Sequence, residues 1–254
     1  MPPLTINGLV IEAEEGKTVL EAARESGFTI PTLCHHSGLS PYGACRLCLV
    51  EVKAGFRPGL TASCTLPVMD GLVLETDSPP VTEARRFVAG LLLARAPENQ
   101  AIKDLAASLG VTGTDLTTEP DECVLCGRCV RACAALGLHA VSFAFRGPKR
   151  RVLPALDRPS PVCIACRACE EVCPTGAVKA RLAAGAVEIE PWHTRQEIQA
   201  CPDCGRPYVT TRQDEHLRGL TPEEQHLRSR LCPACRRRKA AAEVAVAGGL
   251  GFIP

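Results

Sequence analysis

Cysteines are the residues of this 254-residue sequence that are best suited to bind metals. There are sixteen of them, and they fall into four sets of four with long cysteine-free stretches between the sets. Four thiolates are what a tetrahedral metal ion or a small iron–sulfur cluster takes from a protein. Each set could therefore hold one inorganic group. In chain order the sets are Cys34, Cys45, Cys48 and Cys64; Cys123, Cys126, Cys129 and Cys133; Cys163, Cys166, Cys169 and Cys173; and Cys201, Cys204, Cys232 and Cys235.

The second and third sets share the spacing C-x2-C-x2-C-x3-C, and the third is followed by Pro174. One such run also suits zinc. Two in tandem are typical of ferredoxins with two [4Fe-4S] clusters, in which the fourth cysteine of each run binds the other cluster. We therefore predict crossed ligation. Cys123, Cys126, Cys129 and Cys173 are expected to hold one [4Fe-4S] cluster, and Cys163, Cys166, Cys169 and Cys133 the other.

The first set has the long, uneven spacing C-x10-C-x2-C-x15-C. A two-iron cluster needs thiolates from two sides, and backbone N–H groups in a tight loop can donate to its sulfurs. Cys34, Cys45, Cys48 and Cys64 are thus expected to hold one [2Fe-2S] cluster. The alternatives are a structural zinc ion and a Rieske-type centre that uses His35 or His36, although four cysteines already complete the ligand set.

The fourth set consists of two short knuckles in the spacing C-x2-C-x27-C-x2-C. Such knuckles can place four thiolates in a tetrahedron, so Cys201, Cys204, Cys232 and Cys235 are expected to hold one structural zinc ion. A single iron, as in rubredoxin, or a further iron–sulfur cluster would also suit four thiolates. Between the knuckles, Thr221 followed by Pro222 predicts the start of a helix.

The elements that must position the first set are a hairpin and a helix. Residues 4–16 alternate apolar and polar side chains around Asn7 and Gly8, which predicts a β-hairpin. Thr18 can cap a helix that Gly27 ends. A helix packed across such a hairpin indicates a β-grasp domain.

Further along, residues 81–109 have the apolar spacing of a helical segment that breaks near Pro97, and residues 139–161 predict short strands with a turn at Gly147. The expected fold class is α+β with four parts. These are a [2Fe-2S] β-grasp ferredoxin domain at 1–78, a helical linker at 79–118, a bacterial-ferredoxin-like domain with two [4Fe-4S] clusters at 119–190, and a zinc-ribbon-like module with a C-terminal tail at 191–254.

Three stretches around the first set, "IPTLCHH", "GACRLCLVEV" and "ASCTLPVMDGLVLET", resemble the N-terminal [2Fe-2S] domain of the large iron–sulfur subunit of respiratory NADH dehydrogenase. The same domain occurs in diaphorase subunits of NAD-linked [NiFe] hydrogenases, in electron-bifurcating hydrogenases and in NAD-dependent formate dehydrogenases. The resemblance runs from residue 1 to about residue 180.

The sequence departs from this family in the helical linker. The resemblance implies a further [4Fe-4S] cluster there, held by one histidine and three cysteines. Ala96 stands where the histidine would fall, and Gln100 stands where the first cysteine would fall. The other two cysteines are absent as well, so we predict that this chain lacks the histidine-ligated cluster.

The resemblance implies an electron-transfer subunit that works between a flavoprotein subunit oxidising NAD(P)H and a separate catalytic subunit, such as a [NiFe] hydrogenase or a formate dehydrogenase. The sequence contains no G-x-G-x-x-G or other phosphate-binding loop, so we expect no nucleotide site in this chain. No cluster of acid, base or nucleophile side chains suggests a substrate site of its own.

Charge and hydropathy argue against a nucleic-acid-binding or membrane-spanning protein. The formal net charge of +1 gives no nucleic-acid footprint, and no apolar run is long enough to span a membrane. The N-terminus shows no secretion signal, so we expect a cytoplasmic protein whose cysteines serve metals rather than disulfides. Two alternatives stay open: an iron–sulfur subunit of a reductase that does not use NAD, and a nucleic-acid-binding zinc module suggested by the basic residues 235–239.

Overall fold

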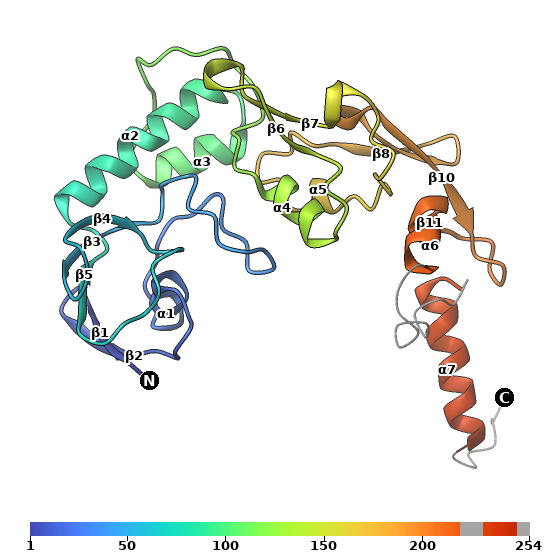
Figure 1. Cartoon of the computed structure of the whole chain (residues 1–254), viewed down its shortest axis with the longest axis horizontal. Helices are drawn as coiled ribbons and strands as arrows, with labels where there is room; N and C mark the ends of the chain where they lie inside the picture. The colour runs from blue at the N-terminus through green and yellow to red at the C-terminus, as the bar shows by residue number, and fades with distance from the viewer. Residues whose placement is uncertain (219–230, 248–254) are drawn as a thin grey trace. The chain divides into compact units, whose positions relative to one another are not determined.

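The computed structural model describes residues 1–218 and 231–247 (Figure 1). By their internal contacts the residues form two compact units. Met1–Leu153 and Ala168–Ala177 make the first unit, and Pro154–Arg167 and Val178–Pro254 make the second. This division does not test the limits expected for the four parts of the chain, which stay predictions.

The first unit begins with a five-stranded sheet in the order β2-β1-β5-β3-β4 (Figure 1). The central strands β1 and β5 are parallel, and the other neighbours are antiparallel. Asn7 and Gly8 turn the chain between β1 and β2 with φ angles of 51° and 79°, so the predicted hairpin is confirmed. The strands are β1 (Pro3–Ile6), β2 (Leu9–Glu12), β3 (Leu49–Ala54), β4 (Gly59–Ala62) and β5 (Leu72–Glu75).

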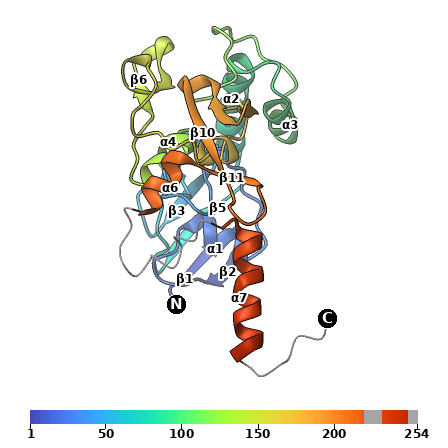
Figure 2. The same ribbon diagram turned by 90° about the vertical axis from the view of Figure 1, so that its right-hand side faces the viewer.

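Helix α1 (Val19–Glu25) packs on this sheet, and Figure 2 shows it beside the strands. Thr18 caps the helix as predicted: its Oγ1 accepts the N–H of Glu21, and the Glu21 carboxylate accepts the N–H of Thr18 at 2.8 Å. Leu20 of α1 and Leu4 of β1 share one buried apolar cluster. A helix packed on a mixed sheet of this order is the arrangement of a β-grasp fold.

Helices α2 (Pro79–Arg95) and α3 (Gln100–Ser108) form the helical segment. They are separated where Pro97 predicts a break, because proline cannot donate the backbone hydrogen bond that a helix interior needs. Asn99 caps α3, since its Oδ1 accepts the N–H of Ile102 at 3.3 Å.

The other elements of the first unit follow the cysteine loops. Strands β6 and β7 pair around a short 3₁₀ turn that starts at Gly147, so the predicted strands and turn are confirmed. Helices α4 and α5 lie in contact. The elements are α4 (Arg128–Ala135), β6 (Ser142–Ala144), η1 (Gly147–Lys149), β7 (Arg151–Leu153) and α5 (Ala168–Glu171).

The second unit is built on an antiparallel sheet in the order β11-β10-β9-β8. Both units thus mix helices and strands, which confirms the mixed α and β class. The elements are η2 (Ala155–Asp157), β8 (Ala180–Ala183), β9 (Ala186–Ile189), η3 (Glu190–Trp192), β10 (Thr194–Ala200), β11 (Pro207–Thr210), α6 (Thr211–Arg218) and α7 (Pro233–Ala247).

The helix predicted to start at Thr221 lies outside the described residues. Within residues 1–218 and 231–247, none of the helices has the length and apolar character that crossing a membrane requires.

Candidate metal centres

The first cysteine set folds into two hydrogen-bonded thiol pairs. The bond between Cys34 and Cys45 raises the pKa of Cys34 and lowers the pKa of Cys45 to about 5. The bond between Cys48 and Cys64 raises the pKa of Cys64 and lowers the pKa of Cys48 to about 6. The charges of Cys34 and Cys45 add to the rise at Cys64, so the four sulfurs gather in one place.

The spacing of the sulfurs in the first set differs from that in the C-terminal set. A tetrahedral zinc ion with Zn–S bonds of about 2.3 Å needs its four sulfurs within roughly 4 Å of one another. Among the residues that the structure describes, the C-terminal cysteines form a group within 4.8 Å, and the N-terminal cysteines do not. Two separate pairs fit two iron atoms that each take two thiolates.

The loop before Cys48 turns backbone N–H groups toward the sulfurs. Gly43 and Arg46 have φ angles of 68° and 57°, and left-handed residues of this kind in a loop form concave anion sites from successive N–H groups. The N–H of Cys45 donates to the Sγ of Cys34 at 3.5 Å. A negatively charged sulfur core fits such a loop.

The second cysteine set lies on a loop that also contains residues in the left-handed backbone conformation. Leu125 and Gly127 have φ angles of 56° and 71°. Burial raises the pKa of both Cys123 and Cys126, and the N–H groups of Leu125 and Arg128, which donate to these sulfurs, oppose the rise. The backbone at Gly127 also lies close to the Phe143 ring, because a Cβ at this position would be 3.0 Å from the ring.

Cys173, the last cysteine of the third set, lies beside the second set. Burial is the largest cause that raises the pKa of Cys123, Cys126 and Cys129, and the charge of Cys173 raises all three further. The fold of the first unit thus brings Cys173 to the three cysteines with which crossed ligation pairs it.

The third set repeats the backbone of the second. Ala165 and Arg167 have φ angles of 52° and 64°, at the positions that Leu125 and Gly127 occupy in the second set. A left-handed conformation costs a non-glycine residue about 1–2 kcal/mol, so its repetition at equivalent positions indicates a functional constraint. The division between the two units falls inside this set. Cys163 and Cys166 belong to the second unit, and Cys169 and Cys173 to the first.

The junction of α2 and α3 holds both chain segments that bear the Cys123 and Cys173 sulfurs. Arg95 donates from Nε to the carbonyl of Cys123 at 3.2 Å and pairs with Asp121 at 2.9 Å. Asn99 donates from Nδ2 to the carbonyl of Thr175 at 2.7 Å. The residues at the positions where the resemblance implies ligands of a histidine-ligated cluster have other contacts here. Ala96 is buried in an apolar cluster, and the Gln100 amide donates to Asp104.

Two arginines of α4 hold the loop that bears Cys34. Arg128 donates to the carbonyl of His35, and Arg131 donates to the carbonyls of Cys34 and Ser40. Within the described chain, the Nε atoms of both arginines are buried without a hydrogen-bond partner. The helix that carries Cys129 is therefore fixed to the first cysteine loop by a cationic clamp. Sequence reasoning missed this clamp, since its partners lie more than 90 residues apart.

A cavity of about 300 Å³ lies between the first and second cysteine loops, inside the first unit. Cys45 and Cys126 both line this cavity, together with the apolar side chains of Val88, Leu91 and Leu92 from α2. The two predicted cluster sites are thus neighbours across a space that no side chain fills.

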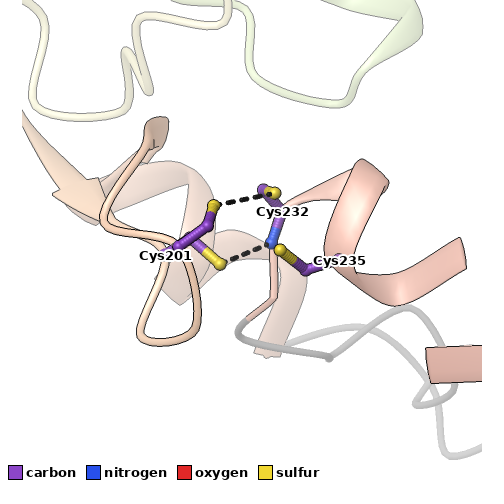
Figure 3. Close-up of side chains that lie close together, drawn as sticks. Cys201, Cys232 and Cys235 are labelled. Atoms are coloured by element: carbon purple, nitrogen blue, oxygen red, sulfur yellow. Dashed lines mark hydrogen bonds between the residues drawn. The ribbon is translucent and has the colours of Figure 1, made fainter. Parts of the chain in front are cut away.

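The fourth set forms a single tight group in the second unit. Figure 3 shows Cys201, Cys232 and Cys235 with their sulfurs turned toward one another. The N–H of Cys232 donates to the Sγ of Cys201 at 3.3 Å, and the sulfurs of Cys204 and Cys232 are 3.7 Å apart. Cys204 is exposed, and the other three are buried.

Hydrogen bonds prepare this group to bind a cation. Burial opposes the ionisation of Cys201, but the N–H groups of Cys232, Cys204 and Asp203 outweigh burial and lower the pKa of Cys201 to about 6. Arg238 pairs with Asp203 and lies 3.6 Å from the Sγ of Cys235. Arg238 belongs to the basic stretch 235–239, so part of that stretch serves the cysteine site.

Comparisons with known proteins agree with this geometry. A family described as "2Fe-2S iron-sulfur cluster binding domain" matches residues 3–79, and one described as "4Fe-4S binding domain" matches residues 162–179. The domain with the first cysteine set and the domain with the third are therefore iron–sulfur domains.

Similar proteins are components of redox complexes. One subunit of the NADH-quinone oxidoreductase of Rhizobium meliloti (strain 1021) is 30% identical over 81% of this chain and 27% of its own length. The HndD component of the NADP-reducing hydrogenase of Solidesulfovibrio fructosivorans is 32% identical over 70% of this chain and 36% of its own length. The chain thus spans between about a quarter and about a third of the length of these curated relatives.

A solved structure extends the likeness to the fold. A chain in the crystal structure of an NAD+-reducing [NiFe]-hydrogenase in the H2-reduced state is 26% identical, with a TM-score of 0.58. The match covers 88% of this chain and 98% of that chain. Over the span that it shares with these relatives, the chain belongs to the family of iron–sulfur subunits found in NADH-quinone oxidoreductase and in the NAD(P)-linked hydrogenases.

Proposed function

We propose that this chain relays electrons between a flavoprotein subunit that oxidises NAD(P)H and a separate catalytic subunit, such as a [NiFe] hydrogenase or a formate dehydrogenase. The observation that carries the proposal is the meeting of the Cys45 and Cys126 loops at one cavity of about 300 Å³. Iron–sulfur clusters supply one-electron acceptors at low potential, and neighbouring clusters allow electrons to pass between them.

The ligand sets of the proposal are those of the crossed pattern. Cys34 and Cys45 hold one iron of the [2Fe-2S] cluster, and Cys48 and Cys64 hold the other, since these are the pairs that the first unit forms. The [4Fe-4S] ligands are Cys123, Cys126, Cys129 and Cys173 for one cluster, and Cys163, Cys166, Cys169 and Cys133 for the other. The position of Cys173 beside Cys123, Cys126 and Cys129 supports this assignment.

The route between the first two clusters is direct in this proposal. The resemblance implies a histidine-ligated cluster on the helical segment, and in this chain Ala96, buried in an apolar cluster, stands at the position of the histidine. The clamp of Arg128 and Arg131 ties the Cys34 loop to the helix of Cys129. Electrons therefore pass from the N-terminal loop to the second cysteine set without a further centre on α2 or α3.

We assign zinc to the C-terminal site, which makes residues 191–254 a zinc-ribbon-like module. Four sulfurs within 4.8 Å suit one tetrahedral ion, and backbone N–H groups already stabilise the Cys201 thiolate. A zinc ion does not change its oxidation state, so the site holds the second unit together and takes no part in electron transfer.

Metal analysis tests the proposed cofactors. The chain prepared without oxygen should contain about ten irons and about one zinc, since one [2Fe-2S] and two [4Fe-4S] clusters occupy the first three cysteine sets. Cys201→Ser should remove the zinc and leave both the iron and the electron paramagnetic resonance (EPR) signals of the reduced clusters unchanged. About fourteen irons without zinc, or loss of iron from Cys201→Ser, would mean that the C-terminal site holds a cluster.

A further inference from the structure

Arg85 is a buried cation without a carboxylate partner. It lies on α2 in line with Val81 and Ala89, on the stripe that packs into the core, and only 7% of its surface is exposed. Its Nη2 donates to the carbonyl of Leu49 at 2.6 Å, and its Nε is buried without a hydrogen-bond partner. Among the described residues, no carboxylate forms an ion pair with Arg85.

A positive charge in a core is costly, because burial removes its hydration and one hydrogen bond to a carbonyl repays only part of the loss. Proteins keep such a charge where a neighbouring anion balances it. The residue bound by Arg85, Leu49, directly follows the predicted cluster ligand Cys48. Burial lowers the pKa of Arg85. The negative charge of Cys48 is the largest influence that opposes this shift, and the carboxylate of Asp77, which forms no ion pair with Arg85, is the smaller one. The negative charge with the largest effect on Arg85 therefore belongs to the first cysteine set.

We infer that Arg85 is the buried counter-charge of the [2Fe-2S] centre and raises its reduction potential. The inference rests on the proposed function, which places four thiolates and two sulfides at this site. Such a centre is negatively charged and gains one further electron on reduction. A fixed cation beside it, shielded from water, stabilises the reduced form more than the oxidised form. Arg85 acts on the centre through its charge and position and is no ligand.

The experiment is a redox titration of the full chain, followed by EPR of the reduced [2Fe-2S] centre. Arg85→Met removes the charge and keeps much of the side-chain volume. At a fixed solution potential, it should lower the ratio of reduced to oxidised centre about tenfold, which is about 59 mV for one electron. Arg85→Lys keeps the charge and should stay within about twofold of the wild type. Arg86→Met, an exposed arginine one position further on, is the matched control and should leave the ratio unchanged.

The outcomes separate the charge from a purely structural role. An unchanged ratio in Arg85→Met, or an equal shift in Arg85→Lys, would overturn the inference. If Arg85→Met fails to assemble the centre, the lysine variant decides: retention of the signal in Arg85→Lys supports the counter-charge, and equal loss refutes it. Absence of any [2Fe-2S] signal from the wild-type chain would instead refute the proposed function.

Discussion

Cys173→Ser is expected to destroy the [4Fe-4S] cluster held by Cys123, Cys126 and Cys129, and to spare the cluster whose other ligands lie in its own run. The charge of Cys173 raises the pKa of all three cysteines, which supports the proposal that it shares their cluster. Serine is a poor substitute for a thiolate, so the chain should lose up to about four of its roughly ten irons and one cluster signal.

A set of single cysteine variants checks this expectation. Crossed ligation predicts that Cys173→Ser and Cys123→Ser lose the same EPR signal. It predicts that Cys133→Ser and Cys163→Ser lose the other signal. Cys204→Ser, in the C-terminal site, is the matched control and should lose neither. If Cys173→Ser instead loses the same signal as Cys163→Ser, each run binds its own cluster and the crossed assignment is wrong.

The second large effect is expected from Cys48→Ser in the assembled complex. Cys48 is a buried member of the first cysteine set and pairs with Cys64. Its replacement should disable the [2Fe-2S] centre and stop the passage of electrons from NADH, through the flavoprotein, to the [4Fe-4S] clusters. The measurement is the rate of cluster reduction after rapid mixing with NADH, followed by freeze-quench EPR.

Cys204→Ser again serves as the control, since it changes an exposed cysteine of the C-terminal site and should leave the relay intact. Reduction of the [4Fe-4S] clusters at the wild-type rate in Cys48→Ser would make the N-terminal domain a side branch. The direct route proposed between the first and second cysteine sets would then be wrong.

Much of the fold was accessible from the sequence because local signals determine it. Asn7 and Gly8 form the expected hairpin turn, Thr18 forms the expected cap, and the helix breaks near Pro97. Each of these depends on the preferences of a few adjacent residues. The cysteine spacing likewise predicted iron–sulfur domains, and the matched families confirm them for residues 3–79 and 162–179.

The parts that could not be predicted depend on distant residues or on unfavourable conformations. Leu125, Ala165 and Arg167 adopt left-handed backbone angles that their residue types disfavour, so no propensity indicates them. The hairpin of β8 and β9 turns at Ala184 and Gly185, a weaker turn signal than an Asn-Gly pair. The arginine clamp joins α4 to a loop far along the chain, which only the folded structure reveals.

The burial of Arg85 could have been predicted from the sequence pattern, although its role could not. It falls four positions after Val81 and four before Ala89, on the apolar side of a predicted helix. A charged residue on such a stripe signals a buried charge that needs an anion. The sequence thus indicates a buried charge at Arg85. Only the structure, which places the first cysteine set beside that helix, indicates which anion the charge faces.

In the proposed relay, the chain carries electrons but does not itself oxidise NAD(P)H. The most direct test is anaerobic addition of NADH to the cluster-loaded full chain, with and without the flavoprotein partner, while the clusters are followed by EPR. We expect no reduction of the clusters by NADH alone, and reduction of the [2Fe-2S] and [4Fe-4S] clusters when the flavoprotein is present. NADH-driven reduction of an artificial acceptor by the purified chain, with no flavoprotein in the sample, would contradict the relay.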